Sequence, residues 1–206
     1  MSLFALLLLA AAAAPATAAD WQSLFDGRSP AAFLSITGGP VDPGSWAVQD
    51  GCLCALSTTA GRQDLRTRAE FEAFELEFDW RSPVKGNSGV KYLIERIDDW
   101  PHPQGQGRHA RARGREYQLG DDSIFPQKQR QAAALYGEIA PSQSAARPLG
   151  EWNQSRIVVK PTGEVEHWLN GQRVVSYQSK IHRSPISLQN HNTAVCFRNL
   201  RIRALQ

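Results

Sequence analysis

Apolar and acidic residues alternate strictly from Phe74 to Trp80. Side chains of a β-strand point alternately to the two faces of a sheet, so this period of two predicts a half-buried strand. Phe74, Leu76, Phe78 and Trp80 would face a core, and the acids between them would face outward. Because such a strand must bury its apolar face against another layer, the chain is expected to pack one sheet against a second element.

Two tight turns predict further paired strands. Asp50-Gly51 separates the predicted strands 45–49 and 52–56, and Asn170-Gly171 separates 165–169 and 172–177. Dipeptides of this kind favour the positive φ angles of two-residue hairpin turns. Each pair is therefore expected to form an antiparallel hairpin.

The remaining segments also predict strands and turns. Short strands are expected at 90–96, 116–119, 155–160, 185–191 and 195–202. We predict a tight turn at 86–89, a long loop from Asp98 to Arg113, and an irregular region at 123–147 with a helical turn at 132–136. Neither a long amphipathic helix nor a sequence repeat is evident. Many short strands separated by Gly, Pro and Asn predict an all-β sandwich.

The first nineteen residues predict a secretory signal peptide. An apolar run from Leu3 to Ala14 is followed by small residues up to Ala19. This pattern is typical of a cleaved signal, and the run is too short for a stable membrane span. We therefore expect a signal peptide at 1–19, one domain at 20–206, a periplasmic or secreted location, and no membrane insertion after cleavage.

The whole chain has a formal net charge of +3, and its basic residues gather in one segment. They are Arg108, Arg111, Arg113 and Arg115, with His102 and His109 nearby. A basic cluster can bind nucleic acid, but a run of charge is more often a solvated face. Because the chain is expected to be secreted, we predict no nucleic-acid partner. The oligomeric state is left open.

Three cysteines leave two arrangements open. Cys52 and Cys54 would share one side of a strand, and a bridge from Cys196 to one of them would leave one free thiol. Three buried thiols are the alternative. The sequence lacks metal-ligand spacings of the CxxC or HxH kind. Asp26-Gly27 is a turn of a type that can hold structural calcium at a sandwich edge, but the clustered oxygens are too few, so no metal or cofactor is predicted.

Polar residues mark one strand as a candidate site. Glu116 and Gln118 would share one face of a strand, with Tyr117 and Leu119 on the other. Asp121 follows at the end of this strand. A carboxylate, an amide and a second carboxylate can perform acid–base chemistry on a polar ligand. An ordinary exposed strand is the alternative.

Nine short motifs in order give the chain a resemblance to a known family. They are Leu24-Phe25-Asp26-Gly27, Trp46-Ala47-Val48-Gln49-Asp50-Gly51, Gly86-Asn87-Ser88-Gly89, Glu116-Tyr117-Gln118, Leu135-Tyr136-Gly137, Gly150-Glu151-Trp152-Asn153, His167-Trp168-Leu169-Asn170-Gly171, Leu188-Gln189-Asn190-His191 and Phe197-Arg198-Asn199-Leu200. Together they cover the whole predicted domain, which resembles the 3-keto-disaccharide hydrolase family.

The resemblance implies a fold and an activity. The fold would be a concanavalin A-like jelly-roll sandwich of two antiparallel sheets. The activity would be cleavage of 3-keto-glycosides, in which the ketone at C3 acidifies the proton at C2 and allows elimination or net hydrolysis. A non-catalytic carbohydrate-binding module of the cell envelope is the alternative, and a protein-interaction domain is a third class. The first two imply a carbohydrate partner.

The resemblance also suggests residue roles. Glu116 would be the base or a sugar anchor, and His191, with an ordinary pKa of about 6.5, would be the acid or the donor to the enolate oxygen. Other roles are substrate binding: Asn87, Gln118 and Gln189 at hydroxyls, Asp121 at the sugar or behind His191, Arg198 at the ketone, and Trp152 stacked on a ring. Arg198 has a structural alternative and Trp152 a core alternative. His167 is predicted to be a packing residue.

Overall fold

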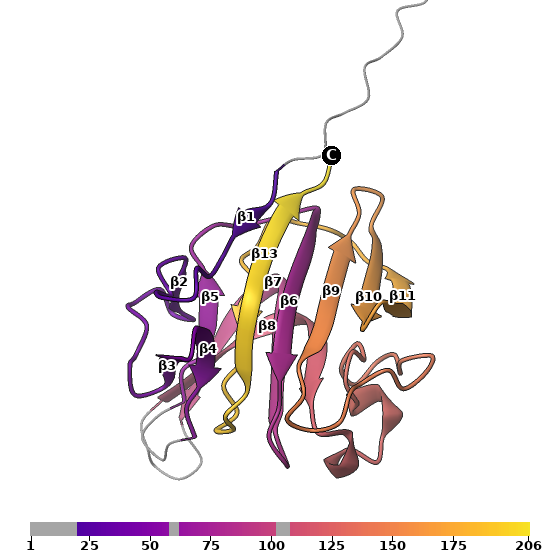
Figure 1. The fold of residues 1–206 in the computed structure, drawn as a ribbon. Coiled ribbons are helices and arrows are strands. Elements are labelled where there is room, and N and C mark those ends of the chain that lie inside the picture. The colour runs from indigo at the N-terminus through magenta and orange to yellow at the C-terminus, as the bar shows by residue number, and fades with distance from the viewer. Residues whose placement is uncertain (1–19, 58–61, 102–107) are drawn as a thin grey trace, which may run out of the picture.

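The protein is a sandwich of two antiparallel sheets, seen in a computed structural model that describes residues 20–57, 62–101 and 108–206 (Figure 1). Sheet A runs β11 (Gln172–Gln178), β10 (Glu164–Leu169), β9 (Asn153–Val159), β6 (Phe74–Arg81), β13 (Cys196–Ala204), β4 (Cys52–Ala55) and β3 (Trp46–Gln49), and β1 (Gln22–Ser23) also pairs with β13. Sheet B runs β2 (Phe33–Ser35), β5 (Leu65–Thr67), β12 (Ser187–Leu188), β7 (Asn87–Pro101) and β8 (Arg108–Gly120). The all-β sandwich predicted from the sequence is confirmed.

The core lies between the two sheets. Phe78 and Trp80 of β6 pack inward from sheet A, and Tyr92 and Tyr117 pack inward from sheet B. The alternation in β6 thus places its apolar residues as predicted. Glu75 and the other acids of β6 face outward, where arginines of β13 cover them.

The predicted hairpin turns are confirmed. Asp50, Gly51, Asn170 and Gly171 all have positive φ, as two-residue hairpins require. The turn predicted at 86–89 is wrong, because β7 begins at Asn87 and only the residues before it form the turn. The helical turn predicted at 132–136 is also wrong. Short 3₁₀ helices instead occupy η1 (Asp122–Ile124) and η2 (Lys128–Arg130).

The long loop predicted from Asp98 to Arg113 is largely a hairpin. β7 continues to Pro101 and β8 starts at Arg108, so the two strands pair as far as Pro101 and Arg108. Ala110 and Ala112 alternate with Arg111 and Arg113, which is a strand pattern that the basic composition concealed. His102 lies outside the described residues. The register shifts between Tyr92 and Arg96, where Leu93 has a positive φ.

Cys54 and Cys196 form a disulfide between the neighbouring strands β4 and β13. Cys52 is a free, buried thiol. Of the two arrangements that the sequence left open, the structure has the one with a bridge to Cys196.

The predicted signal peptide lies outside the described residues. Within the residues that the structure does describe, no helix has the length and apolar character needed to span a membrane.

His167 is a packing residue, as predicted. It is fully buried, its Nε2 lies 2.6 Å from the Tyr92 hydroxyl, and its Nδ1 lies 2.8 Å from the Ala133 carbonyl oxygen. Burial lowers the pKa of His167 to about 4. The ring is therefore neutral in the folded protein at neutral pH.

The stability of the fold is expected to fall on acidification because of His167. Below pH 6.5 the unfolded chain takes up a proton on this residue, whereas the folded protein does not until about pH 4. Between pH 7 and pH 4.5 this difference amounts to about 2 kcal/mol. Urea unfolding should therefore show that the free energy of unfolding falls by about 2 kcal/mol more in wild type than in His167→Gln over this pH interval. An imidazole resonance of folded His167 that titrates near pH 6.5 would contradict this account.

Candidate active site

The outward face of sheet B carries polar side chains, several of which are nearly buried. Glu116 of β8 pairs with Lys91 of β7, which pairs with Ser187 of β12, which pairs with Arg66 of β5. These four side chains therefore form one row across the sheet. Their sequence neighbours, such as Tyr117 and Leu188, face the core instead. This face is called the sheet B face below.

Glu116 is held by two partners through one oxygen. Its Oε2 lies 3.3 Å from Lys91 Nζ and accepts a hydrogen bond of 3.2 Å from Gln189 Nε2. The side chain of Glu116 is only 13% exposed and that of Lys91 only 10%. Burial raises the pKa of Glu116, and the positive charge of Lys91 opposes this shift. The other oxygen, Oε1, makes neither of these two contacts with Lys91 and Gln189, and it lies above Gly89. The carboxylate is thus fixed by one oxygen while the other faces Gly89.

Gly89 makes room at this carboxylate. A Cβ at this position would lie 2.6 Å from Gln189 Oε1 and 2.8 Å from Glu116 Oε1, which is closer than side-chain packing allows. The bare backbone of Gly89 is therefore the floor beneath both functional groups.

Replacing Gly89 by alanine is expected to lower kcat/KM about 100-fold, because displacement of the carboxylate by a fraction of an ångström misaligns it. Steady-state kinetics on a cleaved substrate measure this effect. Gly39→Ala is a suitable control, since its Cβ would make an ordinary contact of 3.4 Å with Ser35. Equal activity of Gly89→Ala and Gly39→Ala would show that the space above Gly89 is not used.

Gln189 lies between Glu116 and His191. Its Nε2 donates to Glu116, and its Oε1 lies 3.2 Å from His191 Nε2. Arg111 Nη1 lies 3.0 Å from the same imidazole nitrogen. Because a guanidinium is only a donor, Nε2 accepts from Arg111 and the neutral ring carries its proton on Nδ1. In this tautomer the approach of Gln189 Oε1 to Nε2 is a contact between two acceptors and not a hydrogen bond. The structure thus brings Glu116, Gln189 and His191 together.

His191 is neutral in this environment. Burial, together with the positive charges of Arg111, Arg62 and Lys91, lowers the pKa of His191 to about 3. An imidazolium acid is therefore scarce at neutral pH, which favours the role of donor to the enolate oxygen among the two roles suggested for His191. The neutral ring keeps a donor at Nδ1.

Arg111 lies at the centre of a second group of contacts. Its Nε donates to His109 Nε2 at 2.7 Å, and its Nη1 lies 3.7 Å from Asp64 Oδ2. Asp64 is fully buried, and burial raises its pKa against the opposing charge of Arg111. Asp64 Oδ1 also accepts a 2.8 Å hydrogen bond from the backbone N–H of Asn190. Arg111 is therefore fixed beside His191 by a buried carboxylate.

Asn87 and Gln118 lie beside this cluster. Gln118 pairs in register with Gly89, and its Nε2 donates to Asn87 Oδ1 at 3.0 Å. The Gln118 Oε1 atom is buried without a hydrogen-bond partner in the described part of the chain. Gln118 therefore shares a face of β8 with Glu116, and Asn87 is hydrogen-bonded to Gln118.

Asp121 does not join the cluster, contrary to the prediction that it supports His191 or binds sugar. Its carboxylate accepts hydrogen bonds from the Lys85 amide at 2.9 Å and from the amide and hydroxyl of Ser123. The Ser123 hydroxyl, followed by the Lys85 amide, lowers the pKa of Asp121. Asp121 thus caps η1 and holds the turn before β7.

Arg198 and Trp152 lie on the other sheet, contrary to the prediction that they bind the same sugar. Arg198 belongs to β13 of sheet A, where it pairs with Asp79 at 3.2 Å and stacks 4.0 Å from the Trp152 ring centroid. Trp152 packs against the three cysteines. The structural alternatives for both residues are therefore supported.

Lys91, Arg111 and Asp64 are site residues that the sequence interpretation missed. Lys91 had a signal, since it is two residues from Gly89 and would face the same side of the strand. Arg111 was read only as part of a basic loop. Asp64 had no signal, because its place depends on how β5 lies in sheet B.

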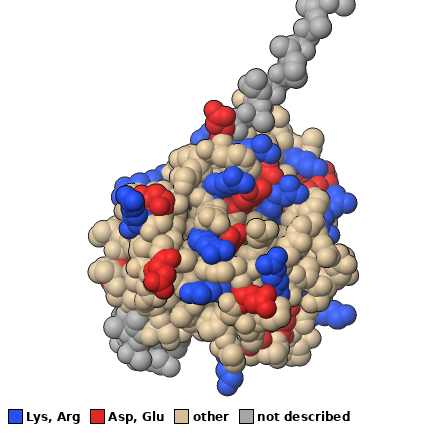
Figure 2. Space-filling model, viewed as in Figure 1, with Lys and Arg blue, Asp and Glu red and all other residues tan. Residues whose placement is uncertain are grey.

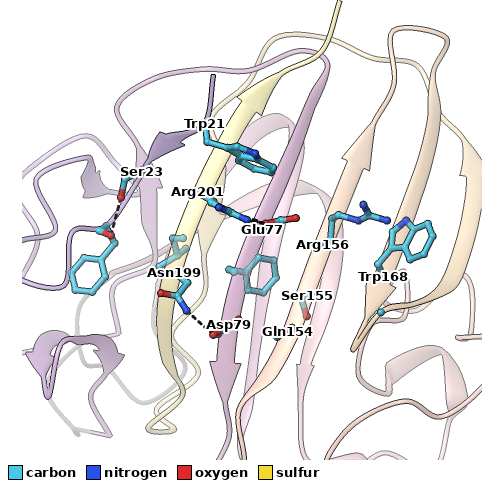
Figure 3. Close-up of a pocket in the computed structure, with 14 residues that line it drawn as sticks. Trp21, Ser23, Glu77, Asp79, Gln154, Ser155, Arg156, Trp168, Asn199 and Arg201 are labelled. Atoms are coloured by element: carbon cyan, nitrogen blue, oxygen red, sulfur yellow. Dashed lines mark hydrogen bonds and ion pairs between the residues drawn. The ribbon is translucent and has the colours of Figure 1, made fainter. Parts of the chain in front are cut away.

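A hollow of about 800 Å³ lies on the outer face of sheet A (Figure 3). Trp21 and Trp168 line it, and the polar groups between them include Gln154 and Asn199. Its charges are paired, because Glu77 binds Arg201, and Figure 2 shows acidic and basic side chains intermixed over this face. Each indole also stacks on an arginine, such as Arg156 at 4.1 Å from the Trp168 centroid. Sheet B is the better candidate for chemistry, because its carboxylate Glu116 is nearly buried beside Lys91 and burial shifts the pKa values of both Glu116 and His191.

The residues that the structure describes contain no group of three or more His, Cys, Asp or Glu side chains placed to hold a metal ion.

Comparison with solved structures identifies the fold. A crystal structure of a Parabacteroides distasonis ATCC 8503 protein assigned to the glycosyl hydrolases superposes with a TM-score of 0.74 and 25% identity, covering 90% of this chain and 94% of that one. The β-glucanase of Bacillus licheniformis superposes with a TM-score of 0.55 and 8% identity, covering 93% and 100%. The glucanase likeness shows the fold alone, and it confirms the concanavalin A-like jelly roll.

Comparison of sequences places the family. A 3-keto-disaccharide hydrolase of Bacteroides thetaiotaomicron (strain VPI-5482) is 27% identical over an alignment that covers 93% of this chain and 80% of the relative. The family profile of the 3-keto-alpha-glucoside-1,2-lyase-like domain matches residues 20–203. The resemblance found in the nine motifs is thereby confirmed, and the chain belongs to the family of 3-keto-alpha-glucoside-1,2-lyase-like domains.

Proposed function

We propose that this protein cleaves the glycosidic bond of 3-keto-glycosides on the sheet B face, with Glu116 removing the proton at C2. The observation that carries the proposal is a nearly buried carboxylate that lies above a bare glycine and is held by Lys91 and Gln189, with the neutral His191 on the other side of Gln189. The name of the Bacteroides relative and its family support the substrate class.

The reaction begins at C2. Glu116 Oε1 takes the C2 proton, which the adjacent ketone acidifies, and an enolate forms. The electron pair then expels the oxygen at C1, which takes a proton as it leaves. Addition of water at C1 and return of a proton at C2 complete a net hydrolysis, and release before this addition gives the elimination product. A raised pKa makes Glu116 a stronger base than an exposed glutamate.

Three donors are assigned to the two oxygens that gain negative charge in the reaction. Lys91 uses two of its three N–H groups, at 2.9 Å from the Ala112 carbonyl oxygen and at 3.3 Å from Glu116, so one can serve the ligand. We assign to Lys91 the protonation of the leaving oxygen. Arg111 and the Nδ1 group of His191 are assigned to the developing enolate oxygen, where fixed donors have the largest effect. Gln189, Gln118 and Asn87 would bind hydroxyl groups.

A non-catalytic carbohydrate-binding module is the second candidate, favoured by the tryptophan-lined hollow on sheet A. Aromatic rings and amides suffice to bind a sugar without reaction. The ionisable cluster around Glu116 exceeds what binding alone needs, so we rank the enzyme first.

A periplasmic or secreted location is part of the proposal. The disulfide between Cys54 and Cys196 supports it, because such bonds persist in oxidising compartments. N-terminal sequencing of the exported protein should find a start near Asp20, and retention of residues 1–19 in a protein recovered from the cytoplasm would contradict it.

The proposed activity is tested with paired substrates. Purified protein is incubated with a 3-keto-β-glucoside and with the parent glucoside, and aglycone release is followed by mass spectrometry. We expect release from the keto compound alone, because only the ketone acidifies C2. Equal release from both would point to ordinary hydrolysis. Saturable binding without release would favour the binding module.

A further inference from the structure

The sheet B face carries more positive than negative charge. Its cations are Lys91, Arg111, Arg62 and Arg66, and its carboxylates are Glu116 and Asp64. Lys91 pairs with Glu116, and Arg111 pairs with Asp64. Arg62 lies close enough to Asp64 and His191 to shift the pKa values of both. Glu116 and Asp64 are therefore both paired with other cations, and neither is paired with Arg66.

Arg66 is the cation for which the fold supplies no acid. It makes no ion pair or hydrogen bond within the described ranges, and its Nε is buried there without an acceptor. Arg66 lies in register with Ser187, whose hydroxyl is also buried and without a partner in the described part of the protein. A buried N–H group without an acceptor destabilises a protein, so an acceptor from a ligand would relieve this penalty.

We infer that the natural substrate is a 3-keto-glycoside bearing a carboxylate, and that Arg66 binds this carboxylate. The inference rests on the proposed function and extends it to the substrate class. A guanidinium forms two parallel hydrogen bonds with a carboxylate, which suits Arg66 to this role better than to binding hydroxyl groups alone. The positive charge of Arg66 would then be paired with the negative charge of the ligand.

The row across sheet B gives the position of this contact. Arg66 lies three strands from Glu116, which corresponds to about 14 Å between backbones at the usual strand spacing. The Nη2 atom of Arg66 lies close to Gly38, where an added Cβ would come within 3.0 Å of it. We place the carboxylate on the far side of the reacting ring or on the neighbouring aglycone. Both locations present the same chemical group to Arg66.

Three substrates distinguish these locations. They are a 3-keto-glucoside with a neutral aglycone, the matching 3-keto-glucuronide, and the 3-keto-glucoside of a carboxyphenyl aglycone. We expect kcat/KM to be about 10- to 100-fold higher for one of the two acidic substrates than for the neutral one, because a charged hydrogen bond contributes on this scale. Raising the ionic strength should reduce this preference.

Arg66→Gln is expected to remove the preference while leaving kcat/KM for the neutral substrate within about twofold. Arg68→Gln is the matched control, since Arg68 is an exposed arginine next to the same strand and binds the Ala31 carbonyl oxygen. Equal kcat/KM for neutral and acidic substrates, or an equal loss on all three in Arg66→Gln, would overturn the inference.

Calorimetric titration with unreactive ligands separates this inference from the proposed function. The wild type is titrated with methyl glucuronide, methyl glucoside and the carboxyphenyl glucoside. Tighter binding of an acidic ligand that is lost in Arg66→Gln supports the inference even if no substrate is cleaved, in which case the proposed function alone fails. Indistinguishable binding of all three ligands overturns the inference even if the neutral keto substrate is cleaved.

Discussion

Glu116→Gln is expected to lower kcat for cleavage of a 3-keto-glycoside by about 10³-fold while the protein stays folded. The amide keeps the size of the carboxylate and can still accept a hydrogen bond from Lys91, but it cannot take the C2 proton. Single-turnover release of the aglycone measures the effect, and thermal unfolding confirms the fold. In wild type, kcat/KM should rise with pH as Glu116 ionises, through a pKa above the ordinary 4.5 because of burial.

Glu77→Gln provides the matched control for this substitution. Glu77 is also a strand glutamate paired with a basic side chain, Arg201, but it lies on sheet A in the tryptophan-lined hollow. We expect its removal to leave turnover unchanged. If Glu77→Gln abolished turnover and Glu116→Gln did not, the chemistry would belong to the hollow of Figure 3 rather than to the sheet B face.

Arg111→Met is expected to lower kcat/KM by about 10²- to 10³-fold, the effect of removing one fixed donor from a developing negative charge. It should also destabilise the fold by about 3–5 kcal/mol, because Asp64 would remain as a buried charge without its partner. Urea unfolding and steady-state kinetics measure the two effects. The pKa of His191 should rise, since Arg111 is the leading charge that lowers it.

A double variant separates the two roles of Arg111. In Asp64→Asn combined with Arg111→Met, the buried charge is gone, so stability should recover while kcat/KM stays low. Arg113→Met serves as the control on the same strand, because Arg113 is exposed and pairs with Asp98. Recovery of activity together with stability would mean that Arg111 only supports the fold.

The strands were predictable from the sequence because each carries its own pattern. The alternation in β6 and the Asn-Gly turn between β10 and β11 depend only on neighbouring residues. The pairing of Glu116 and Gln118 on one face likewise follows from the period of a strand. The hairpin of β7 and β8 was missed because its arginines and glycines resemble a loop in composition.

The site was only partly predictable because strand order is not a local property. His191 and Arg198 are seven positions apart, yet the chain crosses between the sheets there, so His191 joins sheet B and Arg198 joins sheet A. Lys91 reaches Glu116 through the register of β7 with β8. The position of Asp64 in the site depends on the placement of β5, which lies three strands from β8 in sheet B. Contacts of this kind require the assembled sheet.

The most direct test of the account is the fate of the hydrogen at C2. A 3-keto-glycoside is cleaved in D₂O, and the recovered keto sugar is analysed by mass spectrometry and NMR, with Glu116→Gln and a sample without enzyme as controls for spontaneous exchange. Removal of the C2 proton by Glu116 predicts one deuterium at C2 of the enzymatic product and a slower reaction for substrate deuterated at C2. Cleavage at full rate with the C2 hydrogen retained would contradict the account.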